Sequence, residues 1–155
     1  MQFFLIGVLV LLTGCFSFSK EKKESQSQVL RINIGDDPQS LDPRRARALK
    51  DITLLRHLFE GLTRKNPQGK IEFALAKDMQ VSEEGTRYRF TLIKSYWSNK
   101  DLVTAHDFAY AWHKVLDPTF PSDIAYQMYL IKNAQAVKEG KMSSSELGIR
   151  VLSDC

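Results

Sequence analysis

Alternating apolar and polar residues predict β-strands at several places along the chain. Residues 29–35 alternate in this way, and residues 86–93 do so more regularly. Because consecutive side chains of a strand point to opposite faces, a period of two indicates strands with one buried face. A short strand is also expected at residues 71–73, and the start of another at 149–152.

Apolar residues at helical spacing predict helices in other segments. One helix is expected over residues 46–60, and Gly61 is expected to end it in the left-handed conformation. A single helical turn is expected within 74–79. Another helix is expected from about Ser122, continuing or restarting through 134–138.

The best-defined helix is expected to begin at Thr104. Its hydroxyl can cap the backbone N–H of Asp107, and the Asp107 carboxylate can reach back as the weaker half of a capping box. The helix is expected to end at Asp117, because the residue before a proline is disfavoured in the α region.

Clusters of proline, glycine, asparagine and aspartate predict the connections between these elements. They occur at residues 36–43, 63–70 and 82–85. Such residues favour chain reversal, so these segments are expected to be loops or turns.

The N-terminus is typical of an exported, lipid-anchored protein. Residues 3–12 are apolar apart from one glycine, which is too short a run for a transmembrane helix and typical of a signal peptide. The following Leu12-Thr13-Gly14-Cys15 resembles a bacterial lipobox, although no Lys or Arg precedes the run. We therefore expect residues 1–14 to be a signal peptide and Cys15 to carry the lipid. The alternative is a buried cysteine in a hydrophobic helix.

The composition bounds the remaining chain. Residues 17–28 are polar, charged and serine-rich, so residues 15–28 are expected to be the lipidated cysteine and a flexible tether, and residues 29–155 suffice for one modest domain. The net charge of +4 comes from scattered basic residues, which indicates a solvated face rather than a nucleic-acid site. With two cysteines, one of them lipidated, no disulfide framework is expected.

No residue pattern predicts catalysis. His106 and His113 are seven residues apart on one expected helix, but two ligands without a third make a weak metal site. Cys155 stands at the chain end, where nothing is expected to orient a base beside it. We therefore expect a protein that is not an enzyme and that holds no metal or cofactor.

Several stretches, in their order along the chain, resemble one family. They are "SLDP", "HLFEGLTRKNPQGK", "YRFTLIKSYWSNKDLVTAHDFAYAW", "VLDP" and "IKNAQAVKEGK". They are similar to the oligopeptide-binding proteins of bacterial ABC importers, solute-binding protein family 5. The resemblance implies an α/β fold, the N-terminal part of a two-lobed periplasmic-binding-protein fold of class II type. It also implies an oligopeptide held extended between lobes that close and present it to an ABC permease.

Three positions depart from the family pattern. An Asp-Gly turn is here Asn99-Lys100, so a remodelled or slightly strained loop is expected. Arg47 stands where some members have an acidic ligand-contacting residue. A tyrosine that touches peptide in some members falls near Ile124, with Tyr126 two residues on. Arg47 and Tyr126 are therefore the candidate ligand-binding residues.

The family's members are several-fold longer than this chain, so the resemblance implies a truncated or fragmentary copy. The expected function is that of the oligopeptide-binding component of an ABC import system, anchored by lipid on the periplasmic side or the cell surface. The expected partners are the peptide, the permease and the membrane. The alternative is a decayed lipid-anchored surface protein without transport activity.

Overall fold

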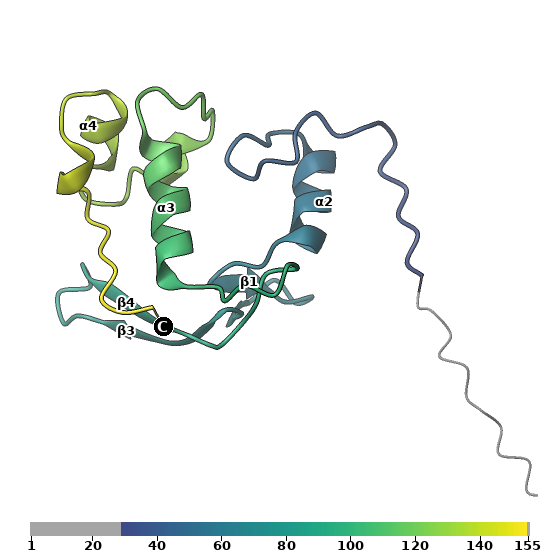
Figure 1. The fold of residues 1–155 in the computed structure, drawn as a ribbon, viewed down its shortest axis with the longest axis horizontal. Helices are drawn as coiled ribbons and strands as arrows, with labels where there is room; N and C mark the ends of the chain where they lie inside the picture. The colour runs from purple at the N-terminus through teal and green to yellow at the C-terminus, as the bar shows by residue number, and fades with distance from the viewer. Residues whose placement is uncertain (1–28, 155) are drawn as a thin grey trace, which may run out of the picture. The chain divides into compact units, whose positions relative to one another are not determined.

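The structure, a computed structural model, describes residues 29–154 of the chain (Figure 1). It divides the chain into two units, Met1–Asn33 and Ile34–Cys155. The predicted signal peptide, Cys15 and the tether lie outside the described residues. Within the described range, no helix is long and apolar enough to cross a membrane.

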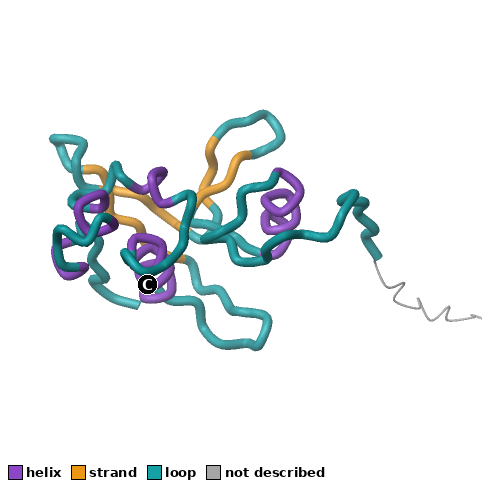
Figure 2. The backbone as a smooth tube through the Cα atoms, turned by 90° about the horizontal axis from the view of Figure 1, so that it is seen from above, coloured by secondary structure: helices purple, strands orange, loops and turns teal. Residues whose placement is uncertain are grey.

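The second unit combines short helices with two β-hairpins, drawn as helices above strands in Figure 1. Its elements follow in the order α2 (Leu49–Leu58), β1 (Thr63–Lys65), β2 (Ile71–Phe73), β3 (Ala76–Val81), β4 (Tyr88–Leu92), α3 (Ala105–Leu116), the 3₁₀ helix η1 (Ala125–Met128), α4 (Ala134–Lys138) and the 3₁₀ helix η2 (Ser144–Glu146). The strands form two separate antiparallel pairs, β1 with β2 and β3 with β4 (Figure 2).

The turn of the first hairpin follows from its sequence. The Asn66 side-chain oxygen accepts hydrogen bonds from the N–H groups of Gln68 and Lys70, at 3.0 and 2.9 Å. Gly69 has a φ of +76°, which a residue without Cβ adopts at little cost. The predicted turn at 63–70 is therefore present, but its first three residues belong to strand β1.

The second hairpin carries one apolar and one polar face. Met79 lies opposite Phe90, and Val81 lies opposite Tyr88, whereas Gln80 lies opposite Arg89. The strand predicted at 86–93 is confirmed, with bounds Tyr88–Leu92. The helical turn predicted at 74–79 is wrong, because that segment pairs with β4 instead.

Helix α3 begins and ends where the sequence predicts. The Asp107 carboxylate accepts the Thr104 N–H at 2.7 Å and the Thr104 hydroxyl at 3.1 Å. Both halves of the expected capping box are present, and the Asp107 carboxylate makes the short bond back to the Thr104 N–H. At the other end, Asp117 is extended, with φ −61° and ψ 125°, and ends the helix before Pro118.

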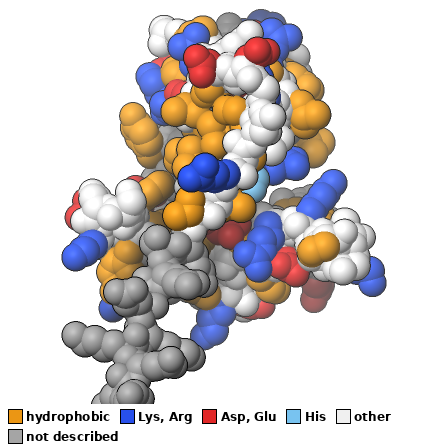
Figure 3. Space-filling view, turned by 90° about the vertical axis from the view of Figure 1, so that its right-hand side faces the viewer, with side chains coloured by type: hydrophobic (Ala, Val, Ile, Leu, Met, Phe, Trp, Pro, Cys, Tyr) orange, Lys and Arg blue, Asp and Glu red, His pale blue; other side chains and the backbone are white. Residues whose placement is uncertain are grey.

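The best-packed core of the second unit lies where α3, α4 and η2 meet. It contains four buried side chains, with further apolar residues packed against it; the four are Leu116, Ala134, Val137 and Leu147. Elsewhere many large apolar side chains are exposed, and one face of the molecule shows a broad hydrophobic area (Figure 3).

Several predicted elements differ from the structure. Residues 29–35 and 149–152 are not strands. Their alternating pattern suits a strand, but a strand also needs a neighbouring strand for its backbone hydrogen bonds, and these segments pair with none among the described residues. The helix expected from Ser122 is reduced to the short η1, although α4 forms at 134–138. Gly61 does not adopt a positive φ; a side chain there would place its Cβ 3.1 Å from the Thr63 carbonyl oxygen, so close packing explains this glycine.

The turn at Asn99-Lys100 has the strain that the sequence predicts. Lys100 has a φ of +76°, in the left-handed region that glycine favours. The Lys100 N–H donates to the Trp97 carbonyl, and the Trp97 N–H donates to the Asp101 carbonyl, both at 2.8 Å. The Asn99 amide bonds the Asp101 carboxylate at 2.6 Å. These bonds hold Lys100 in an unfavourable backbone conformation.

Candidate ligand-binding surface

The loop before α2 contains an ion pair between Asp42 and Arg44. Arg44 donates from Nε to Asp42 Oδ1 and from Nη2 to Asp42 Oδ2, both at 2.8 Å, in the two-pronged geometry that suits a guanidinium and a carboxylate. The hydrogen bonds between these two side chains lower the pKa of the Asp42 carboxyl and raise the pKa of the Arg44 guanidinium. The buried Asp51 of α2 also holds this loop, by accepting the Gln39 N–H at 3.2 Å.

The same loop lies against a segment that is distant in sequence. The Arg44 guanidinium lies over the Phe120 ring, 5.0 Å from its centroid, where the ring's electron-rich face attracts a cation. The Ser122 hydroxyl donates to the Arg44 carbonyl at 2.8 Å. These contacts join loop 42–47 to residues 120–126.

The two candidate residues lie near this junction. Arg47 Nη1 donates to Asp123 Oδ2 at 3.2 Å, and the Arg47 side chain is 70% exposed. Tyr126 is also exposed and follows Asp123 by three residues, on η1. The structure therefore places Arg47 beside the segment that carries Tyr126. Sequence reasoning missed Asp123, because nothing local links residues 76 positions apart.

Lys138 stabilises the turn that leads into this segment. Its ammonium donates to the carbonyl oxygens of Asp117 and Phe120, at 2.8 and 2.6 Å. Hydrogen bonds from the Thr119 side chain and backbone, and then from Lys114, lower the pKa of Asp117 to about 2. The turn after α3 is thus stabilised by the ammonium groups of Lys114 on α3 and Lys138 on α4.

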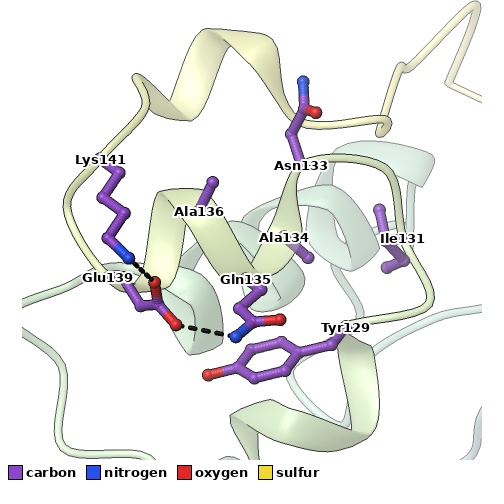
Figure 4. A pocket seen from close by; sticks show the side chains of 8 residues that line it. All are labelled: Tyr129, Ile131, Asn133, Ala134, Gln135, Ala136, Glu139 and Lys141. Carbon is purple, nitrogen blue, oxygen red and sulfur yellow. Dashed lines mark hydrogen bonds and ion pairs between the residues drawn. The ribbon is translucent and has the colours of Figure 1, made fainter.

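A shallow cleft of about 360 Å³ lies around α4 (Figure 4). Glu139 stands at its edge, accepting from Gln135 at 2.8 Å and from Lys141 at 2.6 Å. These hydrogen bonds, the one from Lys141 first, lower the pKa of Glu139. Gln135, Glu139 and Lys141 bind one another here, so these three polar groups do not converge on a ligand.

A second cleft, of about 500 Å³, lies between the end of α3 and the residues after α4. It is lined by Tyr110, His113 and Lys114 on one side and by Met142 on the other. The other histidine of α3, His106, lies 3.5 Å from the Asp154 carboxylate. Among the described residues, no three histidines, cysteines or carboxylates lie close enough to hold a metal ion.

Comparison with known protein families decides the assignment. The model for bacterial extracellular solute-binding proteins, family 5 (middle region), matches residues 70–151, more than half of the chain. The chain belongs to this family. This confirms the resemblance drawn from the motifs, and the fold is the expected part of a two-lobed family 5 receptor.

Individual relatives support the same family assignment. The oligopeptide-binding protein OppA of Bacillus subtilis is 41% identical over 143 residues, which are 91% of this chain and 26% of the relative. The structure of Haemophilus influenzae OppA in complex with RPPGFSPFR aligns with a TM-score of 0.74 at 34% identity, over 79% of this chain and 24% of that one. The Escherichia coli murein tripeptide-binding protein MppA aligns with a TM-score of 0.72 at 36% identity, over 77% of this chain and 24% of that one.

The match covers this chain far more fully than it covers the relatives. The chain spans about a quarter of the length of the curated relatives that it matches. A family 5 receptor therefore contains much that these 155 residues do not include.

Proposed function

We propose that this chain forms part of the oligopeptide-binding component of an ABC import system. The observation that supports it most strongly is the 41% identity to an oligopeptide-binding protein over nearly the whole chain. The shared backbone with an OppA structure bound to a nine-residue peptide agrees with this choice of ligand. An extended peptide can be held through its own backbone groups, which tolerates many side-chain sequences.

Arg47 and Tyr126 are the proposed ligand contacts. One nitrogen of the Arg47 guanidinium bonds Asp123, while the exposed side chain leaves other N–H donors facing solvent. A peptide carboxylate or carbonyl could accept from those donors, and Asp123 could accept from a peptide amine. The exposed Tyr126 ring adds an apolar surface with a hydroxyl at its edge.

The proposal includes a place in the cell. We propose that Cys15 is lipidated after removal of residues 1–14, and that the chain is thereby anchored outside the cytoplasmic membrane, where it meets an ABC permease. Mass spectrometry of protein from a bacterial membrane should show acyl mass on Cys15 as the first residue. Processing that is unchanged in a Cys15→Ser variant would contradict the anchor.

We expect the chain alone to bind peptide weakly. In a two-lobed receptor closure excludes water around the peptide backbone, whereas a partial lobe leaves the ligand half-solvated. Calorimetric titration of the full chain with mixed tri- to pentapeptides should give a Kd weaker than about 1 μM. Tighter saturable binding by a monomer would contradict this expectation.

A chimera tests the function itself. The matched quarter of Bacillus subtilis OppA is replaced by the corresponding residues of this chain, and the same peptides are titrated. We expect micromolar or tighter binding, weakened about tenfold by Arg47→Ala or Tyr126→Ala. Arg45→Ala is the matched control, because it removes a neighbouring exposed guanidinium. A folded chimera without peptide binding would favour the alternative, a surface protein without transport activity.

A further inference from the structure

The Arg44 side chain joins three parts of the second unit. Its guanidinium donates two hydrogen bonds of 2.8 Å to the Asp42 carboxylate, within the loop before α2. The same guanidinium lies 5.0 Å from the centroid of the Phe120 ring, in the segment after α3. Asp42 has the largest effect on the pKa of Arg44, which it raises, and Tyr110 of α3 raises it as well. Arg44 therefore interacts with the loop, with α3 and with the segment that follows α3.

Phe120 is contacted by cations from several elements. Besides Arg44, the ammonium of Lys114 on α3 lies 5.6 Å from the ring centroid. Lys138 of α4 donates to the Phe120 carbonyl oxygen at 2.6 Å. A cation over the face of an aromatic ring is attracted by the ring's electrons, and the attraction grows as water is excluded. The half-buried Phe120 is therefore one residue at which the loop, α3 and α4 are held together.

Arg47 follows this contact closely on the loop side. The N–H groups of Arg45 and Ala46 donate to the Asp42 carbonyl at 3.0 and 3.1 Å, which closes a tight turn around Arg44. The Ala46 side chain is buried, so the turn is packed as well as hydrogen-bonded. A displacement of Arg44 would therefore also displace Arg47, three residues later.

Tyr126 follows Phe120 on the other side of the contact. The Ser122 N–H donates to the Phe120 carbonyl at 2.9 Å, and the Ser122 hydroxyl donates to the Arg44 carbonyl at 2.8 Å. Ala125, the neighbour of Tyr126, is buried. The position of Phe120 is therefore connected to that of Tyr126 through a short and partly packed segment.

The ion pair between Arg47 and Asp123 is a weaker connection between the same two segments. Its side chains are 70% and 61% exposed, and exposed ion pairs contribute little to stability. The contact between Arg44 and Phe120 is less exposed to water and is supported by the two-pronged bond to Asp42. This contact, rather than the exposed pair, is therefore the main determinant of how the two segments lie.

We propose that Arg44 and Phe120 are positioning residues for peptide binding, because their contact holds Arg47 and Tyr126 in the arrangement that binds one peptide. The role rests on the proposed function, since it acts through the two proposed ligand contacts. Neither Arg44 nor Phe120 touches the peptide. When only a fraction of the molecules has the binding arrangement, the apparent affinity falls by that fraction. Loosening the contact therefore weakens binding although no bond to the peptide is removed.

Calorimetric titration of the chimera with Bacillus subtilis OppA tests this role. Phe120→Leu keeps an apolar side chain but removes the ring, so the peptide Kd should weaken about fivefold. Phe120→Tyr keeps the ring and should bind within about twofold of the parent chimera. Phe73→Leu is the matched control, because it makes the same substitution on β2 and should leave the Kd unchanged.

A double-mutant cycle separates positioning from a general loss of stability. Arg47→Ala removes one of the two ligand contacts, so their relative arrangement no longer matters for binding. In that background Phe120→Leu should therefore weaken the Kd by less than about twofold. Additive effects of the two substitutions, or a Kd that Phe120→Leu leaves unchanged, would overturn the role.

Hydrogen exchange of the full chain tests the same contact without peptide. Phe120→Leu should speed exchange of the Ala46 N–H at least about threefold, because the turn that this group closes is loosened. Phe73→Leu should leave that exchange rate unchanged. Unchanged exchange in Phe120→Leu would overturn the positioning role alone, whereas a folded parent chimera that binds no peptide would overturn the proposed function and this role with it.

Discussion

Replacing Lys100 by glycine should stabilise the protein. Lys100 has a φ of +76°, a conformation that costs a residue with Cβ about 1–2 kcal/mol. Glycine removes this cost but loses more backbone freedom on folding, which costs about 0.5–1 kcal/mol. The Lys100 side chain is exposed and takes part in no ion pair within the described residues, so little else is lost. The expected net gain is about 0.5–1 kcal/mol in the free energy of unfolding.

Urea unfolding of the full chain measures this gain. The midpoint should rise while the slope stays unchanged, since the surface exposed on unfolding is the same. Lys100→Ala is the first control, because it removes the charge and keeps the strained φ; it should give no such gain.

Asn133 provides a second control at a similar backbone position. Its φ is +64°, but its side-chain amide donates to the Glu146 carbonyl at 2.8 Å. Asn133→Gly loses this hydrogen bond, which contributes about 1 kcal/mol. This loss offsets the backbone strain that glycine relieves, so no gain like that of Lys100→Gly is expected. If Lys100→Ala stabilises as much as Lys100→Gly, the gain comes from charge, and the backbone argument is refuted.

Three further predictions concern other parts of the second unit. Asp107→Ala should lower the free energy of unfolding by about 1 kcal/mol and by more than Thr104→Ala, because the carboxylate accepts both the N–H and the hydroxyl of Thr104; equal losses in urea melts would contradict this order. Asp117 has a pKa lowered to about 2 from 3.8, so its contribution is present above pH 3.8 and is lost as the pH falls through about 2. Urea midpoints of the protein and of Asp117→Asn should therefore converge over that range, and a constant difference would argue against the shift. Gly148→Ala should destabilise by about 1–3 kcal/mol in thermal melts, since its Cβ would lie 2.8 Å from the Lys132 Cβ; an unchanged melting temperature would show that the backbone moves freely there.

The sequence predicts those elements whose signals are local. The Thr104–Asp107 cap lies within one turn of chain, and the Asn66 and Gly69 turn lies within five residues. Both are present in the structure because a few neighbouring residues suffice to form them. The strained turn at Lys100 was expected on a different ground, because the family that the chain resembles has Asp-Gly where this chain has Asn99-Lys100.

Predictions failed where a distant segment decides the conformation. Residues 74–79 contain good helix formers, yet they pair with β4, whose hydrogen bonds and packing outweigh local propensity. Residues 29–35 alternate as a strand does but form none in the described chain. The Arg47–Asp123 bond, which sets the surroundings of one candidate ligand contact, had no signal in the sequence.

The distribution of buried side chains indicates which parts of the second unit are most stable. The core cluster of Leu116, Ala134, Val137 and Leu147 lies within the C-terminal third of the described residues. In contrast, the apolar side chains of the β1–β2 hairpin remain largely exposed. Local stability follows buried apolar contact, so the hairpin is expected to open more readily than α3 and α4.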